Sequence, residues 1–383
     1  MAGAIQLGQT IRAKLGRVYY GYWILLAGSL ILIFFNGFIF YGFTIFFLPL
    51  ARDFNVSRTQ VSMLYGLSRL EGGMEGPLVG RLIDKLGPRL VVMIGTILTG
   101  VGFILLSRAP NFMMALLVFV LVIAVGYNAG FYHPISTAIN SWFIRRRGTG
   151  FAVLDSVGAA GAVFLVPALS YWVLTYGWRT GALLVGIITM AFVLPLALPI
   201  HRSPESRGLH PDGVAPSAQN QVADVHLGIR QALGTSSFWM LTLTVTLRLS
   251  ITTALSAHMV PMLVWRGIDE AKAAYGVSLF ALGSIVAPLV FGWLGDRWSK
   301  SRLSAIGATV GAGGLLLLLT NTSSWLLYIF PFSVSIALGT AALNWSLVGD
   351  YFGRSSYATL RGMMRVVNGV GTFVFPVYAG WAY

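Results

Sequence analysis

The sequence has 383 residues, of which 56% are hydrophobic and only 10% are charged. A soluble domain has about half apolar and one quarter charged residues, so this composition excludes a soluble enzyme and indicates an integral membrane protein. The net charge of +14 does not indicate nucleic-acid binding here, because in a membrane protein the distribution of basic residues matters more than their sum. The chain has no cysteine, which excludes disulfides and thiolate chemistry.

Long apolar runs without alternating polarity predict membrane-spanning helices rather than the strands of a barrel. The predicted spans are 20–48, 60–83, 90–106, 112–143, 148–175, 180–200, 238–264, 273–294, 303–320, 325–348 and 357–383. The first run is longer than the core of a signal peptide, so we expect it to be retained as a span. We predict an all-α membrane protein.

One long polar segment, residues 201–234, separates the sixth predicted span from the seventh and is rich in Pro, Ser, Gly and Gln. This composition predicts a linker between an N-terminal bundle, residues 1–200, and a C-terminal bundle, residues 235–383. Most Lys and Arg residues outside the spans lie on the side of the N-terminus and the linker, with clusters at 12–17, 81–89, 145–147 and 297–302. By the positive-inside rule, we expect that side to be cytoplasmic.

Two motifs occur twice, about 210 residues apart. Gly80-Arg81-Leu82-Ile83-Asp84-Lys85 stands at the end of the second predicted span, and Gly292-Trp293-Leu294-Gly295-Asp296-Arg297 at the end of the eighth. Trp142-Phe143-Ile144-Arg145 precedes the fifth span, and Tyr351-Phe352-Gly353-Arg354 precedes the eleventh. The repeats indicate two similar halves of six spans. The second half shows five, so either a twelfth helix is missing from this sequence by truncation, which we favour because an odd count leaves one face uncovered, or the protein lacks it.

The repeated loop resembles the loop motif of the major facilitator superfamily. The matching residues are Gly80, Asp84, Lys85, Gly87, Arg89, Gly292, Asp296 and Arg297. The start of the fifth span, from Trp142 through Gly161, is similar to that of the monocarboxylate and oxalate/formate porter families. The resemblance implies two pseudo-symmetric six-helix bundles that work by alternating access. It also implies that Asp84 contacts the inner start of the eleventh helix, and that spans one, four, seven and ten line a central cavity.

The sequence departs from these families in two places. Pro88 stands where the loop motif usually has a basic residue, and the eighth span lacks the ionisable residue that monocarboxylate families often use to bind substrate. The usual lactate-type mechanism is therefore not implied.

Charged residues inside spans cost about 2.5–3.5 kcal/mol each at the bilayer centre, so they indicate function. Arg248 lies near the middle of the seventh span and Arg365 within the eleventh. A guanidinium is a good partner for a carboxylate, which makes an organic anion the favoured substrate. The predicted substrate-binding residues are Arg248, Arg365, Asn36, Tyr127, Asn128 and Asn344. Two structural alternatives remain: Arg248 pairs with a carboxylate across the cavity, and Arg365 pairs with Asp155.

Glu71 and Glu75 lie four residues apart on one helix face, where two carboxylates repel and one can carry a proton. The candidate proton-coupling residues are Glu71, Glu75, Asp155 and His133. The alternative is a static network neutralised by Arg69 and the cavity arginines.

The sequence therefore predicts a proton-coupled secondary transporter, symporter or antiporter, for a small organic anion of the carboxylate type. We expect a monomer in the cell (inner) membrane with no cofactor, metal or nucleic acid. Motifs for ATP hydrolysis, zinc proteolysis and serine hydrolysis are absent from the sequence, so an enzyme is not expected. Two alternatives stay open: efflux of amphipathic compounds, suggested by the aromatic residues of the first span, and a transport-dead receptor or scaffold with the same fold.

Overall fold

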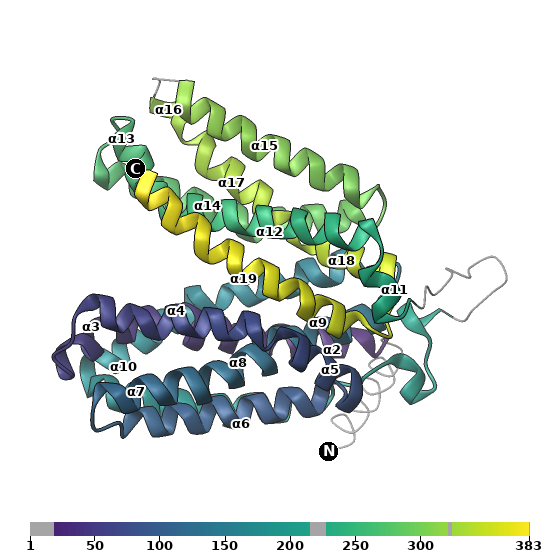
Figure 1. Cartoon of the computed structure of the whole chain (residues 1–383), viewed down its shortest axis with the longest axis horizontal. Helices are drawn as coiled ribbons and strands as arrows, with labels where there is room; N and C mark the ends of the chain where they lie inside the picture. The colour runs from purple at the N-terminus through teal and green to yellow at the C-terminus, as the bar shows by residue number, and fades with distance from the viewer. Residues whose placement is uncertain (1–18, 215–226, 321–323, 383) are drawn as a thin grey trace, which may run out of the picture.

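The computed structural model describes residues 19–214, 227–320 and 324–382, and these are almost entirely helical. The helices form two layers, which lie one above the other in Figure 1. The first layer comprises α2 (Gly21–Phe34), η1 (Phe35–Phe40), α3 (Phe43–Asp53), α4 (Arg58–Met74), α5 (Gly76–Leu86), α6 (Pro88–Ser107), α7 (Phe112–Val118), η2 (Phe119–Ala124), α8 (Val125–Gly130), α9 (Tyr132–Trp142) and α10 (Arg147–Ala197).

The second layer begins after the polar segment. It comprises α12 (Ser236–Ala257), α13 (Met259–Trp265), α14 (Glu270–Gly295), α15 (Lys300–Thr320), α16 (Ser324–Leu327), α17 (Ile329–Gly339), α18 (Ala341–Phe352) and α19 (Tyr357–Ala382). The described parts of the polar segment contain two short 3₁₀ turns and one short helix: η3 (Pro204–Arg207), η4 (Pro211–Gly213) and α11 (Ile229–Leu233).

Local sequence explains where the long spans bend or break. The fifth and sixth predicted spans run together as α10, but Gly177 interrupts them with φ +81°, a conformation that L-residues with side chains rarely adopt. The second predicted span breaks between α4 and α5, where Pro77 stands at the start of the new helix and cannot donate a backbone hydrogen bond. The first and fourth spans each contain one π-helical turn, η1 and η2.

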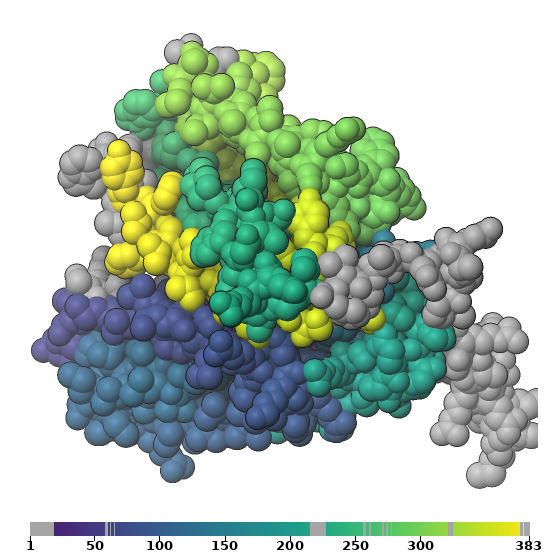
Figure 2. Space-filling model, turned by 45° about the vertical axis from the view of Figure 1, so that its right-hand side comes forward, coloured from purple at the N-terminus to yellow at the C-terminus, as the bar shows by residue number. Residues whose placement is uncertain are grey.

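Hydropathy sets two predicted spans apart from the others. Within the described residues, eight helical segments are long and apolar enough to span a membrane. The predicted spans 60–83 and 357–383 are not among them, and α4, α5 and α19, which form them, pack on one another between the layers. Figure 2 shows α19, in yellow, lying against the purple and blue helices of the first layer. The two most polar predicted spans therefore meet at the contact between the two layers.

Glycines permit the closest contacts between the layers. A Cβ on Gly362 of α19 would lie 2.0 Å from the carbonyl oxygen of Gly76 in α5, so any side chain there would force the helices apart. Gly148 of α10 and Gly292 of α14 make the corresponding contact on the other pair of helices, where a Cβ on Gly148 would lie 2.7 Å from the oxygen of Gly292. Small residues at such interfaces let membrane helices approach closely.

This packing makes a prediction about two glycines of α19. Gly362→Ala should lower the free energy of unfolding by about 1–3 kcal/mol, because the methyl group overlaps the backbone of α5. Gly369→Ala is the matched control, since its Cβ would meet Gly73 at an ordinary 3.5 Å. Thermal unfolding in detergent should therefore show a lowered midpoint for Gly362→Ala alone; equal midpoints for both variants would contradict the packing account.

Candidate functional site

Asp84, at the end of α5, binds the start of α19 in the other layer. Its Oδ2 accepts hydrogen bonds from the backbone N–H of Thr359 at 3.0 Å and from Thr359 Oγ1 at 2.6 Å. The first N–H groups of a helix have no partner within the helix and carry partial positive charge, so a carboxylate is stabilised there. The contact that the sequence resemblance implied for Asp84 is thus present.

Asp296, at the end of α14, makes the corresponding contact with the start of α10. Its two oxygens accept from the N–H groups of Gly148 at 2.8 Å and Thr149 at 3.0 Å, and from Thr149 Oγ1 at 2.5 Å. Burial raises the pKa of both Asp84 and Asp296, although these hydrogen bonds oppose the rise. In both contacts, an aspartate at the end of a helix in one layer binds the start of a helix in the other layer. The repeated sequence motif was the signal for the second contact.

His133 of α9 holds the same peptide unit that Asp84 binds. Its Nε2 lies 3.0 Å from the carbonyl oxygen of Ala358, so the peptide between Ala358 and Thr359 is held at both its C=O and its N–H. His133 is buried, and its Nδ1 has no partner among the described residues. The structure places His133 at this interlayer contact.

Further ion pairs surround these contacts at the end of the molecule that carries the polar segment, here called the linker end. Asp350 of α18 accepts from Arg147 of α10 at 2.9 Å and from Lys300 of α15 at 2.5 Å. Arg354 donates to Glu205 of η3 at 2.8 Å and to the carbonyl of Ser141 at 3.3 Å.

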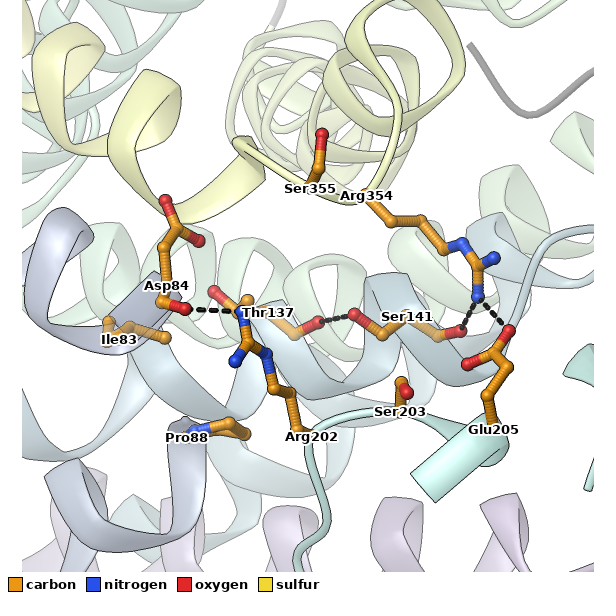
Figure 3. Close-up of a pocket in the computed structure, with 10 residues that line it drawn as sticks. All are labelled: Ile83, Asp84, Pro88, Thr137, Ser141, Arg202, Ser203, Glu205, Arg354 and Ser355. Carbon is orange, nitrogen blue, oxygen red and sulfur yellow. Dashed lines mark hydrogen bonds and ion pairs between the residues drawn. The ribbon is translucent and has the colours of Figure 1, made fainter. Parts of the chain in front are cut away.

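A cavity of about 200 Å³ lies between these groups, lined by both layers and the polar segment. Figure 3 shows Arg354 and Glu205 pointing toward each other across it, with Arg202 and Asp84 at its other side. Arg202 donates to the backbone oxygen of Asp84 at 2.5 Å. The linker end is therefore closed by paired polar groups from both layers.

The remaining residues of the loop motif make local contacts or face the surface. A Cβ on Gly80 would lie 2.4 Å from the oxygen of Ala358, so glycine permits the Asp84 contact. Gly87 ends α5 with φ +85°, while Lys85 is exposed and Arg89 partly so. Arg297 folds back on its own helix, with its guanidinium 4.0 Å from the ring of Trp293.

Deeper between the layers, Asn128 joins two charges of opposite sign. Its Nδ2 donates to Glu71 Oε2 at 3.0 Å, while its Oδ1 and backbone oxygen accept from Arg365 at 3.4 and 3.2 Å. Glu75 interacts with Glu71 and with Arg365. We call Glu71, Glu75, Asn128 and Arg365 the Glu71 cluster. Tyr127 lies beside it and donates to Ser68 at 2.9 Å.

A second group surrounds Asp155 of α10. Tyr132 donates to Asp155 Oδ1 at 2.5 Å, and the positive charges that act on Asp155 belong to Arg361 and Arg248 of the second layer. We call these four residues the Asp155 cluster. Asp155 is therefore hydrogen-bonded to Tyr132 and lies within electrostatic reach of Arg361 and Arg248. Arg365, the partner considered from sequence, donates to Asn128 instead.

Arg361 and Tyr132 were missed by sequence reasoning. Arg361 lies four residues after the start of α19 and counts by position as a basic residue of the linker end, yet it is 3% exposed. Its guanidinium lies 4.1 Å from the ring of Trp345 and 4.7 Å from that of Tyr132, and it donates to Ser136. Its four-residue spacing from Arg365, which puts both on one face of α19, was the available signal.

Arg248 of α12 has donors to spare. Its Nη1 donates weakly to the carbonyl oxygen of Leu338 at 3.3 Å. Its Nε and Nη2 are buried and have no hydrogen-bond partner among the described residues. Asp155 and Tyr132 are the groups whose charges act on it. A buried donor without an acceptor is costly.

Two predicted binding residues make no hydrogen bond with either cluster in the part of the chain that the structure describes. Asn344 is 1% exposed, and its Oδ1 accepts from Ser304 of α15 at 3.2 Å, while its Nδ2 has no partner among the described residues. Its role in the cavity wall stays a prediction. Asn36 lies in η1, where its side chain contacts Gly158 of α10. Arg69 lies 4.4 Å over the ring of Phe40.

No group of three His, Cys, Asp or Glu side chains in the described ranges is placed to hold a metal ion.

Comparisons with known proteins match the whole arrangement. The family model described as Major Facilitator Superfamily matches residues 29–376. Monocarboxylate transporter 11 of Homo sapiens is 26% identical over 364 residues, which cover 88% of this chain and 71% of that protein. The gentisate transporter of Corynebacterium glutamicum is 24% identical over 355 residues, covering 86% and 74%.

Solved structures show the same fold. FucP in the outward conformation aligns with a TM-score of 0.67 at 13% identity, covering 94% of this chain and 98% of that one. The human organic anion transporter MFSD10 (TETRAN) aligns with a TM-score of 0.65 at 16% identity, covering 94% and 92%.

The Asp84 contact makes a prediction about closure of the linker end. Asp84→Asn removes the charge at the start of α19 and should shift the population toward an open linker end by roughly two- to fivefold. Since the natural chain has no cysteine, a single Thr137→Cys reporter in the cavity wall can be followed by maleimide labelling, which should accelerate by that factor.

Asp53→Asn is the control, because Asp53 pairs with Arg179 at the opposite end of the first layer. Labelling that is no faster in Asp84→Asn than in Asp53→Asn would show that the Asp84 contact does not hold the linker end closed.

Proposed function

Because this chain belongs to the Major Facilitator Superfamily, we propose that it carries a small carboxylate-type organic anion across the cell (inner) membrane, coupled to protons. The protein is a multi-pass membrane transporter and not an enzyme. In the proposed mechanism, residues 1–200 and 235–383 rock about a central site, with the N-terminus and the linker in the cytoplasm. The linker end described above is then the cytoplasmic gate, in its closed state.

The observation that carries the proposal is that Nε and Nη2 of the buried Arg248 have no hydrogen-bond partner among the described residues. Arg248 lies twelve residues after the start of α12, roughly 18 Å along the helix, close to the middle of a hydrocarbon core about 30 Å thick. Its two unpartnered nitrogens present the fork that binds a carboxylate through two hydrogen bonds. A substrate carboxylate would supply the acceptor that the protein itself does not.

The charges of the Asp155 cluster also favour an anion. Arg248 and Arg361 come from the second layer, whereas Asp155 is the one carboxylate in the cluster, so the group carries an excess positive charge when all three are ionised. A monocarboxylate would neutralise that excess in a region of low dielectric, where unbalanced charge is expensive. The matched relatives named for monocarboxylates and gentisate support the same substrate class.

The Glu71 cluster carries the opposite excess, since two carboxylates face one arginine. One proton shared between Glu71 and Glu75 would balance it, because two neighbouring carboxylates cannot both stay ionised cheaply. Arg365 belongs to α19 and Asn128 to α8, so opening the cytoplasmic gate would pull the arginine away from the carboxylates. Proton uptake would compensate that loss, which links protonation to the conformational change.

The alternative of efflux of amphipathic compounds has less support. The aromatic residues of the first span, on which it depends, are largely used for packing: Phe35 stacks on Phe131, and Phe43 contacts Phe119. These two rings pack against neighbouring aromatic side chains, which explains their presence without a binding surface for amphipathic compounds.

Arg248→Gln should lower uptake of radiolabelled monocarboxylates, gentisate among them, into proteoliposomes by roughly 10- to 100-fold, the value of a hydrogen-bonded charge contact. Arg302→Gln, at an exposed arginine of α15, is the matched control and should transport at the wild-type rate. Wild-type uptake by Arg248→Gln would remove this residue from the substrate site.

Glu75→Gln should separate transport from its proton gradient. Uptake by the wild type should rise when the outside is acidified, and this stimulation should disappear in Glu75→Gln while anion exchange at equal pH persists. Asp53→Asn, at the opposite end of the first layer, should keep the stimulation. An unchanged response to the gradient in Glu75→Gln would return the acidic pair to a structural role.

A further inference from the structure

An apolar groove of about 470 Å³ runs along the outside of the first layer, between α2 and the end of α10. Trp23, Leu26 and Leu30 line it from α2, and Leu196 lines it from α10. Trp23 is 38% and Leu26 49% exposed, so the groove opens toward the membrane rather than toward the interior. It lies apart from both charged clusters and from the gate.

The length of the groove matches one leaflet of a bilayer. Tyr20 lines it at the linker end and Leu30 at the other, which is ten residues or roughly 15 Å of helix. The hydrocarbon core of one leaflet is also about 15 Å thick. A groove of this length and composition fits an acyl chain of the leaflet on the linker side.

Positive charge stands at the end of the groove where a lipid headgroup would lie. The guanidinium of Arg207, the last residue of η3, lies 4.1 Å from the ring of Tyr20. Arg207 is exposed and makes no ion pair within the part of the chain that the structure describes. Partial burial and the charges of Arg207 and Arg89 lower the pKa of His201, so the local potential is positive. The His201 ring lies 5.7 Å from that of Tyr20, at a tilt of 55°.

The position of Arg207 is fixed by its neighbours. Two residues earlier in the same turn, Glu205 binds Arg354 of the second layer. Upstream, the carbonyl of His201 accepts from Trp142 Nε1 at 2.9 Å, and that of Pro199 accepts from Tyr20 at 3.0 Å. The guanidinium is therefore held over the groove rather than extended freely into water.

From the groove and the arginine over its end, we propose that this surface binds an anionic phospholipid, with one acyl chain along α2 and the phosphate on Arg207. Basic groups between helices at headgroup depth recognise anionic lipids in this way. A zwitterionic lipid fits less well, because its ammonium group would lie near the positive charges of Arg207 and Arg89. If the linker is cytoplasmic, as proposed above, this lipid lies in the cytoplasmic leaflet. Lipid binding here does not depend on which substrate is transported.

Native mass spectrometry of the purified full chain tests this with two lipids of equal chain length, phosphatidylglycerol and phosphatidylcholine. The wild type should retain phosphatidylglycerol preferentially. Arg207→Gln should weaken phosphatidylglycerol binding roughly fivefold and leave phosphatidylcholine unchanged, since one arginine near a headgroup contributes about a factor of this size. Leu30→Trp, which fills the groove, should weaken both lipids.

Arg302→Gln serves as the matched control, because Arg302 is exposed beside the start of α15 and far from the groove residues in sequence. Equal retention of the two lipids by the wild type would overturn the proposal. So would a result in which Arg207→Gln and Arg302→Gln bind phosphatidylglycerol equally well.

Discussion

The arrangement depends on two carboxylates that each bind the free N–H groups of a helix in the opposite layer. Asp84 binds the start of α19 and Asp296 the start of α10. A carboxylate reaches a helix start only if the backbones come close, and Gly80, Gly148 and Gly292 provide that approach. The repeated loop motif is thus one mechanical device used twice, and its charge, its glycines and its position at a helix end are all parts of the same contact.

The packing of the two layers brings the buried charges together. The two spans too polar to qualify as membrane-spanning by hydropathy are packed against each other between the layers, which removes their charges from lipid. There the charges divide into two groups of opposite excess. The Glu71 cluster has one carboxylate too many, and the Asp155 cluster has one arginine too many. A proton and an organic anion are the two species that would correct these imbalances.

Sequence reasoning predicted the helices, the two repeated motifs and the contact made by Asp84, because hydropathy and motif identity are local properties. It missed a residue where the direction of a side chain decides the outcome: Arg361 turns inward between the rings of Tyr132 and Trp345. A residue's depth along a helix can be counted from sequence, but the neighbour it meets depends on how helices distant in the sequence pack.

The most direct test of the central claim is whether a bound anion shields Arg248 from an arginine-specific dicarbonyl reagent, with modification mapped by mass spectrometry. The account predicts that a transported monocarboxylate protects Arg248 selectively, while its neutral amide does not, and that exposed Arg302 is modified equally in both cases. Modification of Arg248 that is unaffected by a transported carboxylate would contradict the account, because the unpaired guanidinium would then serve some purpose other than holding the substrate.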